Sequence, residues 1–422
     1  MERSSRPALR LVHVTTIPES LMFLEGQAGY LRRRGIEICA ISSPGEALEA
    51  FREAEGVECF AVSMERGITP LYDLIALARL WTLLRRLRPD IVDAHTPKAG
   101  LLGVIAAFLA GVPVRIYHLH GLRFMTVRGA RRKILLATER MASLFATRVL
   151  CVSHTIAAVA AARDLVPDEK LGVLLSGSIN GVDVDRFRPA RPEERCAARA
   201  KLGLPADSRV VGFIGRLVRD KGLVELAAAW GVLREEMPDL WLVLVGPFES
   251  QDPVPEAVAG RLRSDPRVRV VGEDFDTPKY YRALDVVALP TYREGLPVVP
   301  LETAAMGLPI VASRVPGCID AILDGVTGTL VAARDDVALA GALRTYLNDA
   351  ALRARHGAAA RERVLRDFQQ ERIWSELHKE YVGLSLRAGR NVARASDATV
   401  ATQPASRGLT RPERRTSASR AV

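Results

Sequence analysis

The apolar positions of the first 188 residues fall into short continuous runs, separated by longer stretches with helical spacing. Such runs are typical of strands buried on both faces, and the spacing between them is typical of amphipathic helices. The expected strands are Leu9–Thr15, Ile36–Ser42, Ile91–Ala94, Val114–His118 and Val149–Val152. The expected helices are Leu24–Arg34, Leu71–Leu87, Ala99–Ala110 and Ala130–Ala146. This alternation predicts a doubly wound parallel sheet with helices on both faces.

A second alternation of the same kind follows the Pro189–Arg199 stretch. Its expected strands are Val210–Ile214, Trp241–Val245, Val268–Val271, Val286–Leu289 and Ile310–Ala312. Its expected helices are Gly222–Glu236, Pro300–Met306 and Val337–Asn348, and the segment Pro278–Arg282 lies between the third and fourth strands. Two copies of one architecture predict an α/β chain of two Rossmann-like domains facing a cleft. Ligands of such sheets bind at the carboxyl ends of the strands, so the loops there are the candidate sites.

Residues 387–422 lack aromatic residues and apolar periodicity and are expected to form a disordered basic tail. This segment supplies six of the ten net positive charges. The rest of the chain is only mildly basic, and aromatic residues make up 5% of the sequence, so nucleic acid is not an expected partner.

The cysteines and the apolar segments indicate in which cellular compartment the protein is expected. The five cysteines are scattered and form no metal-ligand spacing, which favours a reducing compartment without a structural zinc. The first ten residues are charged and do not resemble a secretory signal. The longest apolar stretches, 101–114 and 142–162, are respectively too short for a bilayer and interrupted by Arg148 and His154, so no transmembrane helix is expected.

The stretch 213–222 reads FIGRLVRDKG, a buried strand that ends in glycine and delivers cations before a helix. Arg216 can bind phosphate oxygens through two parallel hydrogen bonds, and Lys221 adds a point charge five residues later. The pair suits a diphosphate.

A second stretch, 292–302, reads YREGLPVVPLE and places Glu294 and Glu302 eight residues apart. Glu294 precedes a glycine turn, and Glu302 falls in the helix that follows. Loop amides and a helix N-terminus between them can hold an anion, while the carboxylates can accept hydrogen bonds from sugar hydroxyls.

Together with the linker 178–183 (SINGVD) and the stretch 118–121 (HLHG), these motifs resemble the retaining GT-B glycosyltransferases of family four, over nearly the whole chain up to the tail. The stretches 42–45 (SSPG), 94–100 (AHTPKAG) and 120–124 (HGLRF) are most similar to the capsular and exopolysaccharide branch. The resemblance implies an N-terminal acceptor-binding domain, 1–183, and a donor-binding domain, 184–371. A helix at about 372–386 would return to the first domain.

The resemblance also implies roles for individual residues. Arg216 and Lys221 would bind the donor diphosphate, and Glu302 the ribose hydroxyls. Glu294 would touch the donor sugar, and His120 would face the reacting sugar, so these two are the candidate catalytic residues. Further donor contacts are expected from the amides of Gly295 and Leu296, and from Gly272 and Glu273 beside the base.

Two departures from the family pattern affect phosphate binding. The loop Thr16–Ser20 lacks the Gly-Gly pair common in the wider family, and Pro297 replaces the second glycine of the common E-G-F-G version, which removes one amide donor. No metal or cofactor is expected, because the cations can neutralise the leaving diphosphate and no D-x-D stands in a setting suited to a metal-bound diphosphate; Asp183–Asp185 lies in the linker. His95 and His118 are expected to be hydrogen-bonded core residues.

A basic cluster precedes and enters the apolar helix around 134–136. It comprises Arg123, Arg128, Arg131, Arg132 and Lys133. This pattern fits either a solvated helix face or a surface for anionic lipid or a lipid diphosphate. With the family resemblance it favours a bacterial protein, peripheral at the cytoplasmic face of the membrane.

The expected activity is therefore transfer of a hexosyl or N-acetylhexosaminyl group from a UDP- or GDP-linked donor to a glycan acceptor linked to polyprenyl diphosphate. Two alternatives stay open: a nucleotide-sugar epimerase on the same fold, and a non-catalytic protein that binds nucleotide sugar or lipid.

Overall fold

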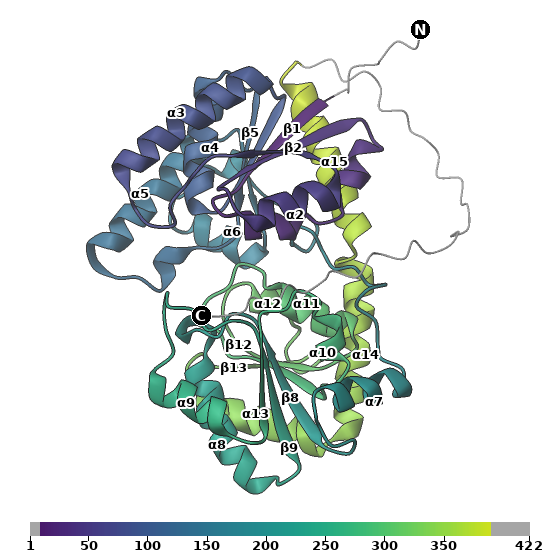
Figure 1. The fold of residues 1–422 in the computed structure, drawn as a ribbon. Helices are drawn as coiled ribbons and strands as arrows, with labels where there is room; N and C mark the ends of the chain where they lie inside the picture. The colour runs from purple at the N-terminus through teal and green to yellow at the C-terminus, as the bar shows by residue number, and fades with distance from the viewer. Residues whose placement is uncertain (1–8, 390–422) are drawn as a thin grey trace, which may run out of the picture.

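Two parallel sheets form the framework of the computed structural model, which describes residues 9–389 (Figure 1). The first sheet has the strand order β3-β2-β1-β4-β5-β6-β7, and the second has the order β10-β9-β8-β11-β12-β13. The order reverses direction between β1 and β4 and again between β8 and β11, which is where doubly wound sheets open a crevice. The prediction of two Rossmann-like domains is confirmed.

The N-terminal domain contains the first sheet. Its strands are β1 (Leu9–Val14), β2 (Ile36–Ser42), β3 (Glu58–Ala61), β4 (Ile91–His95), β5 (Val114–Leu119), β6 (Arg148–Cys151) and β7 (Leu171–Val173). Its α-helices are α1 (Gln27–Arg32), α2 (Glu46–Glu55), α3 (Pro70–Leu87), α4 (Pro97–Leu109), α5 (Gly129–Phe145) and α6 (His154–Ala161). Short 3-10 segments are η1 (Pro18–Leu24), η2 (Arg123–Met125) and η3 (Asp168–Lys170).

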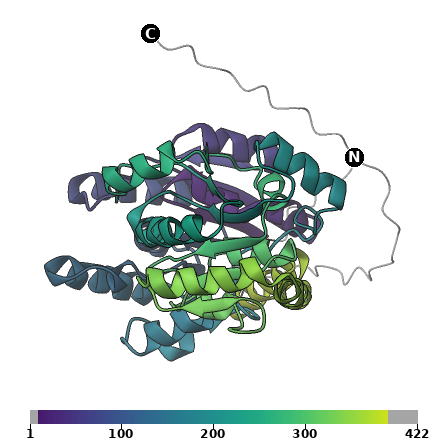
Figure 2. The same ribbon diagram turned by 90° about the horizontal axis from the view of Figure 1, so that it is seen from below.

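The C-terminal domain contains the second sheet. Its strands are β8 (Arg209–Ile214), β9 (Leu240–Val245), β10 (Val268–Gly272), β11 (Val286–Leu289), β12 (Ile310–Ser313) and β13 (Thr329–Val331). Its helices are α7 (Pro192–Lys201), η4 (Arg219–Lys221), α8 (Leu223–Glu236), α9 (Glu256–Ser264), α10 (Pro278–Tyr281), α11 (Val298–Ala305), α12 (Cys318–Ala321), α13 (Asp336–Asn348) and α14 (Ala350–Asp367). Helices cover both faces of this sheet, as Figure 2 shows from below.

The last helix, α15 (Gln370–Arg387), leaves the C-terminal domain and packs on the N-terminal one (Figure 1). Its residues Ile373, Trp374, Leu377 and Tyr381 join the apolar core on one face of the first sheet. Helices α3 to α6 cover the other face. The helix therefore ties the two domains together. Most of the expected tail, from residue 390 onward, lies outside the described residues.

Several elements differ from the sequence-based expectation. The single helix expected at 24–34 is η1 followed by α1, because Gly26 between them adopts the left-handed conformation at φ 82°. Helix α11 begins at Val298 rather than Pro300. The short or polar elements β3, β7, β13, α2, α6, α7, α9, α12 and α14 had not been predicted. Within the described residues, no helix combines the length and apolar character needed to span a bilayer.

Candidate active site

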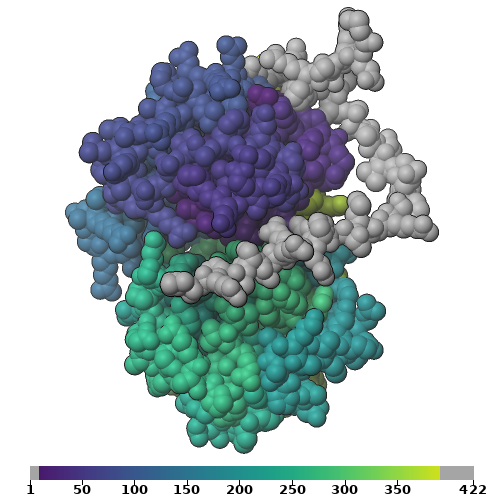
Figure 3. Space-filling view, in the orientation of Figure 1, coloured from purple at the N-terminus to yellow at the C-terminus, as the bar shows by residue number. Residues whose placement is uncertain are grey.

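The two domains touch where the loop after β5 meets the loop after β11. A Cβ atom added to Gly295 would lie 1.7 Å from the carbonyl oxygen of His120, so only glycine fits there. On the opposite side, a Cβ on Gly121 would lie 3.6 Å from the Cα of Gly295. The structure thus brings His120 of one domain against Glu294 and Gly295 of the other. Figure 3 shows the two domains as two lobes, one above the other.

Hydrogen bonds fix this contact. The hydroxyl of Ser153, which also caps α6, donates to the carbonyl oxygen of Gly295 at 2.8 Å. The hydroxyl of Thr155 bonds the carboxylate of Asp320, and the amide of Gly317 donates to the same hydroxyl at 2.8 Å. The first turn of α6 is therefore anchored to α12 and to the candidate site.

The expected diphosphate ligands are already paired with carboxylates. Lys221 Nζ lies 2.5 Å from Glu294 Oε1, and the two side chains are 23% and 11% exposed. Arg216 Nη1 lies 2.8 Å from Glu249 Oε2, with 45% of the arginine side chain exposed. An arriving diphosphate would take the place of Glu249 as the partner of Arg216. Sequence reasoning missed Glu249, which follows no motif.

Arg123 lies nearer to the cleft than its expected place on the basic helix face. Burial lowers the pKa of its guanidinium, and the positive charges of Arg293, Arg131 and Arg216 lower it further. These four cations come from both domains. Arg293 is paired with Asp220 at 2.7 Å, whereas no carboxylate lies within ion-pair distance of Arg123 in residues 9–389. The arrangement produces a positive field suited to anionic substrate groups.

Glu302, on α11, is half-buried, and its Oε2 accepts a hydrogen bond from the Tyr281 hydroxyl at 2.8 Å. Burial raises its pKa to about 7, although the Tyr281 hydrogen bond and the charge of Arg186 oppose the rise. A carboxyl group with this pKa can both donate to and accept from a ribose hydroxyl near neutral pH.

The loops after β8, β9 and β10 lie side by side. The Gly246 amide donates to the Gly272 carbonyl at 2.7 Å, and a Cβ on Gly246 would lie 2.0 Å from the carbonyl oxygen of Gly215. Gly272 therefore lies close to the residue that precedes Arg216, while Glu273 is exposed. Leu296 packs against the apolar cores of both domains.

The histidines of the first sheet are connected. His120 is partly exposed, and its Nε2 lies 3.0 Å from His95 Nδ1. His95 and His118 are hydrogen-bonded core residues, as expected. His13, which sequence reasoning missed because it lies inside an apolar strand, is buried and bonded to His95 at 2.9 Å.

The linker aspartates and the basic cluster do not belong to the contact between His120 and Gly295. Asp183 Oδ1 accepts hydrogen bonds from the amides of Asp185 and Arg186, which is a turn-forming role. Arg128, Arg131 and Lys133 are exposed around the start of α5, and Arg132 lies 5.7 Å from the Phe124 ring centre.

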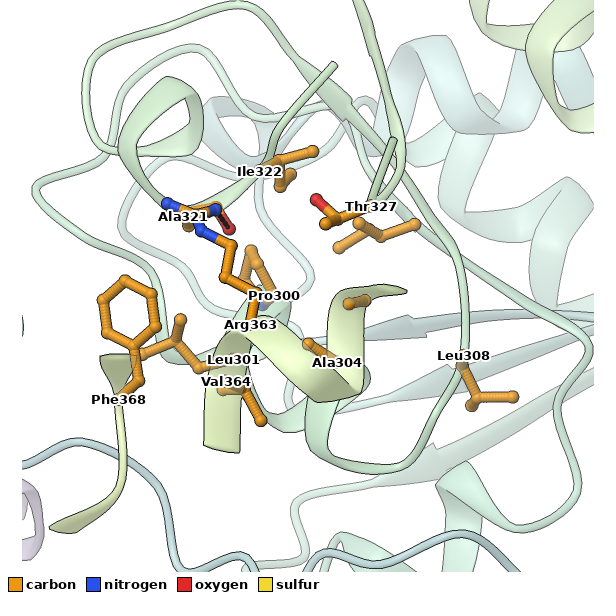
Figure 4. A pocket seen from close by; sticks show the side chains of 12 residues that line it. Pro300, Leu301, Ala304, Leu308, Ala321, Ile322, Thr327, Arg363, Val364 and Phe368 are labelled. Carbon is orange, nitrogen blue, oxygen red and sulfur yellow. Dashed lines mark hydrogen bonds between the residues drawn. The ribbon is translucent and has the colours of Figure 1, made fainter. Parts of the chain in front are cut away.

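A small cavity of about 10 Å³ lies between α11, α12 and α14 (Figure 4). It is lined mainly by apolar side chains, with Arg363 reaching in. Arg363 donates to the carbonyl oxygens of Ala321 and Asp320, which ties α14 to α12. This volume holds one water molecule at most, so the cavity is not a substrate pocket.

Comparison with known proteins assigns the fold and the family. The family description "Glycosyl transferases group 1" matches residues 194–363, and "Glycosyl transferase 4-like domain" matches residues 22–177. The capsular polysaccharide biosynthesis glycosyltransferase CapM of Staphylococcus aureus is 31% identical over 88% of this chain and 96% of its own. The chain belongs to the group 1 glycosyltransferases.

One further related sequence and one solved structure are also similar to this glycosyltransferase. The Escherichia coli UDP-Gal:α-D-GlcNAc-diphosphoundecaprenol α-1,3-galactosyltransferase is 30% identical over 55% of this chain and 59% of its own. The crystal structure of Anabaena HepE in complex with UDP and glucose has a TM-score of 0.74 and 22% identity, covering 89% of this chain and 99% of that one. The predicted GT-B fold and family are confirmed.

Proposed function

We propose that this glycosyltransferase moves a sugar from a UDP- or GDP-linked donor to a glycan on polyprenyl diphosphate, with retention of the anomeric configuration and without a metal ion. The product would enter capsular or another surface polysaccharide. The observation that carries the proposal is the contact of His120 with the Glu294–Gly295 loop, flanked by Lys221 and Arg216. The nearness of the expected sugar-binding residues to the expected diphosphate ligands supports the proposal.

In this proposal the diphosphate leaves as negative charge develops on its oxygens. Arg216, Lys221 and the amides of Gly295 and Leu296 stabilise that charge, so they do what a divalent cation does in other transferases. Glu294 and His120 hold hydroxyls of the sugar while its anomeric carbon gains oxocarbenium character. Glu302 holds the ribose.

The names of two relatives support the acceptor class, since one acts on a diphosphoundecaprenol-linked sugar and the other in capsular polysaccharide biosynthesis. The exposed side chains of α3 and α5 are further support for the proposal that the acceptor is bound to a membrane. It exposes large apolar side chains, with exposed fractions between 46% and 77%, at Leu71, Tyr72, Leu74, Ile75, Ile134, Met141 and Leu144. We call these residues the α3–α5 surface. Helix α4 lies between the two helices (Figure 1).

Charge around the α3–α5 surface fits an anionic lipid bilayer. Arg79 and Arg86 on α3 line a groove of about 540 Å³, together with the apolar Val62, Ile75 and Leu83. Arg128, Arg131 and Lys133 flank the α5 side. None of these cations has a carboxylate within ion-pair distance in the described part of the chain. Exposed apolar side chains with unpaired cations beside them are typical of proteins that bind the anionic cytoplasmic leaflet of a membrane.

The test is nucleotide release. Purified protein is incubated with a panel of UDP- and GDP-sugars, with and without membrane extract as the acceptor source, and Glu294→Ala serves as control. We expect release of one nucleotide that requires extract, persists in EDTA and disappears in the variant. The anomeric configuration of the product, read by NMR, tests retention.

Other outcomes would contradict the proposal in distinct ways. A new nucleotide sugar formed from donor alone would identify an epimerase. Donor binding without nucleotide release under any condition would indicate a binding protein. Loss of release in EDTA that Mg²⁺ restores would contradict metal independence.

A further inference from the structure

Four of the seven histidines of the chain gather at three neighbouring strands of the first sheet. His13 on β1 is the register partner of Asp93 on β4, and His95 on β4 is the register partner of His118 on β5. Asp93 is 0% exposed, and these three histidines are each 2% exposed. His120 follows at the cleft end of β5. A buried polar cluster therefore leads from the interior of the sheet to the floor of the candidate site.

Two hydrogen bonds join three of the rings in a row. His13 Nδ1 lies 2.9 Å from His95 Nε2, and His95 Nδ1 lies 3.0 Å from His120 Nε2. Burial lowers the pKa of His13 to about 4 and that of His120 to about 3, and it holds the pKa of His95 well below its ordinary value. All three rings are therefore neutral at pH 7. A neutral imidazole has one donor and one acceptor, so the row must run in a single direction.

Asp93 determines that direction. Its Oδ1 lies 3.7 Å from His95 Nε2 and has no hydrogen-bond partner among the described residues. A carboxylate oxygen attracts an N–H and repels a nitrogen lone pair at this distance, and it does so strongly in a buried site. The proton of His95 is therefore on Nε2, which leaves Nδ1 as an acceptor. His120 must then donate from its Nε2, and its own Nδ1 carries no proton.

The position of Asp93 is fixed from two sides. The ring of His118 donates from Nδ1 to Asp93 Oδ2 at 3.3 Å, and the Tyr381 hydroxyl donates to the same oxygen at 2.8 Å. Tyr381 lies on α15, the helix that returns from the C-terminal domain. The tautomer of His120 thus depends on residues from both ends of the chain.

We infer that His95, oriented by Asp93, is a positioning residue that fixes the tautomer of His120, so that His120 offers an unprotonated Nδ1 to a hydroxyl group in the cleft. That this hydroxyl belongs to a sugar rests on the proposed function. The hydrogen bonds that join His13, His95 and His120 do not depend on the proposed function.

The first test reads the tautomer directly. Protein labelled with ¹³C-histidine gives Cδ2 chemical shifts that distinguish the two neutral forms, and a His120→Gln variant assigns the His120 signal. We expect His120 with its proton on Nε2 in the wild-type protein, and a mixture of the two forms in His95→Leu. A proton on Nδ1 of His120, or an unchanged signal in His95→Leu, would overturn the inference.

The second test separates positioning from simple packing. We expect His95→Leu to lower kcat roughly tenfold with little change in UDP affinity. His95→Asn, whose amide oxygen lies near the place of the lost Nδ1, should restore part of the rate. The matched control is His356→Leu, which removes a buried histidine bonded to Tyr346 in the C-terminal domain. An equal loss of kcat in His356→Leu, or no rescue by His95→Asn, would contradict the inference.

A third measurement addresses a metal ion, because His13, Asp93 and His95 place ligand atoms within 4.8 Å of one another. Stoichiometric metal in the purified protein that is lost in His95→Leu would overturn the hydrogen-bonded row. The NMR measurement of the His120 tautomer does not depend on catalysis. If His120 carries its proton on Nε2 but the protein turns over no donor, the proposed function is contradicted and the tautomer assignment is not.

Discussion

Lys221 Nζ and Glu294 Oε1 lie 2.5 Å apart, although the residues are separated by 73 positions and belong to different loops. One loop follows β8 and the other follows β11, the two strands between which the order of the second sheet reverses. The ion pair therefore lies at the crevice of the C-terminal domain. It also keeps the Glu294 carboxylate in place before a substrate arrives.

The first prediction follows from this pair. Lys221→Ala and Glu294→Ala should each reduce transfer at least 100-fold, because each removes a charged group that contacts the donor in the proposed site. Circular dichroism should show an intact fold, since neither residue lies in a strand or an α-helix. Arg219→Ala is the control, because Arg219 is exposed and its neighbour Lys221 remains. Wild-type turnover in either variant would refute the site assignment.

The second prediction concerns Arg216, which is paired with Glu249. In the proposed site a diphosphate replaces Glu249 as the partner of Arg216, so Glu249→Gln should tighten UDP binding several-fold. Arg216→Ala should weaken binding about tenfold or more. Isothermal titration calorimetry measures both effects, and Glu256→Gln is a control at an exposed ion pair of the same domain. Weaker binding by Glu249→Gln would mean that Glu249 supports the donor site.

The sequence predicted the sheets because their strands are buried on both faces and read as apolar runs. Edge strand β3 escaped notice because Glu58 and Ala61 are exposed there. The loops after β8 and β11 were found because glycine and charge interrupt the apolar pattern at a strand end. His13 was missed because it lies within such a run, and only the register with β4 gives it partners.

Helix α3 shows why spacing alone did not reveal the exposed apolar side chains of the α3–α5 surface. Its apolar residues fit an amphipathic core helix, and Leu80 and Leu84 are buried as expected. Leu71 and Leu74 belong to the same apolar pattern, yet they are exposed, since α3 packs mainly on α4. Likewise Arg123 reads as part of a basic helix in the sequence, but it lies near Arg216 only because the domains meet.

The third prediction tests the α3–α5 surface. Leu71→Asp should weaken binding to vesicles that contain phosphatidylglycerol about tenfold or more, because it removes an apolar anchor and adds repulsion. Val337→Asp is a matched control, because Val337 on α13 is also 77% exposed. Co-sedimentation at two salt concentrations measures the effect. Equal losses in both variants would contradict a specific membrane-facing surface.

The fourth prediction concerns the C-terminal boundary. A chain that ends at Gly389 should keep the wild-type melting temperature and full turnover of soluble acceptor analogues, because α15 is then complete. A cut after Leu384 would remove the buried Ser385. A cut after Glu380 should be far more damaging, since it removes Tyr381 and its bond to Asp93. Lost turnover in the Gly389 form would show that the tail takes part in catalysis.

The fifth prediction uses Glu139, a buried carboxyl group on α5 that accepts a hydrogen bond from Tyr117 at 2.7 Å. Burial raises its pKa from 4.5 to about 7, against the opposing effect of that hydrogen bond. The folded state therefore binds this proton more tightly than the unfolded state. Its stabilising contribution is complete below pH 4.5 and is lost as the pH rises to 7.

Glu139→Gln removes the ionisable group and keeps an oxygen that can accept from Tyr117. At pH 8 the variant should gain up to roughly 3 kcal/mol in the free energy of unfolding relative to the wild type, and at pH 4 the gain should vanish. Urea unfolding at both pH values measures it, with the exposed Glu362→Gln as control. A gain that is equal at pH 4 and pH 8 would show that packing, rather than the buried charge, governs this position.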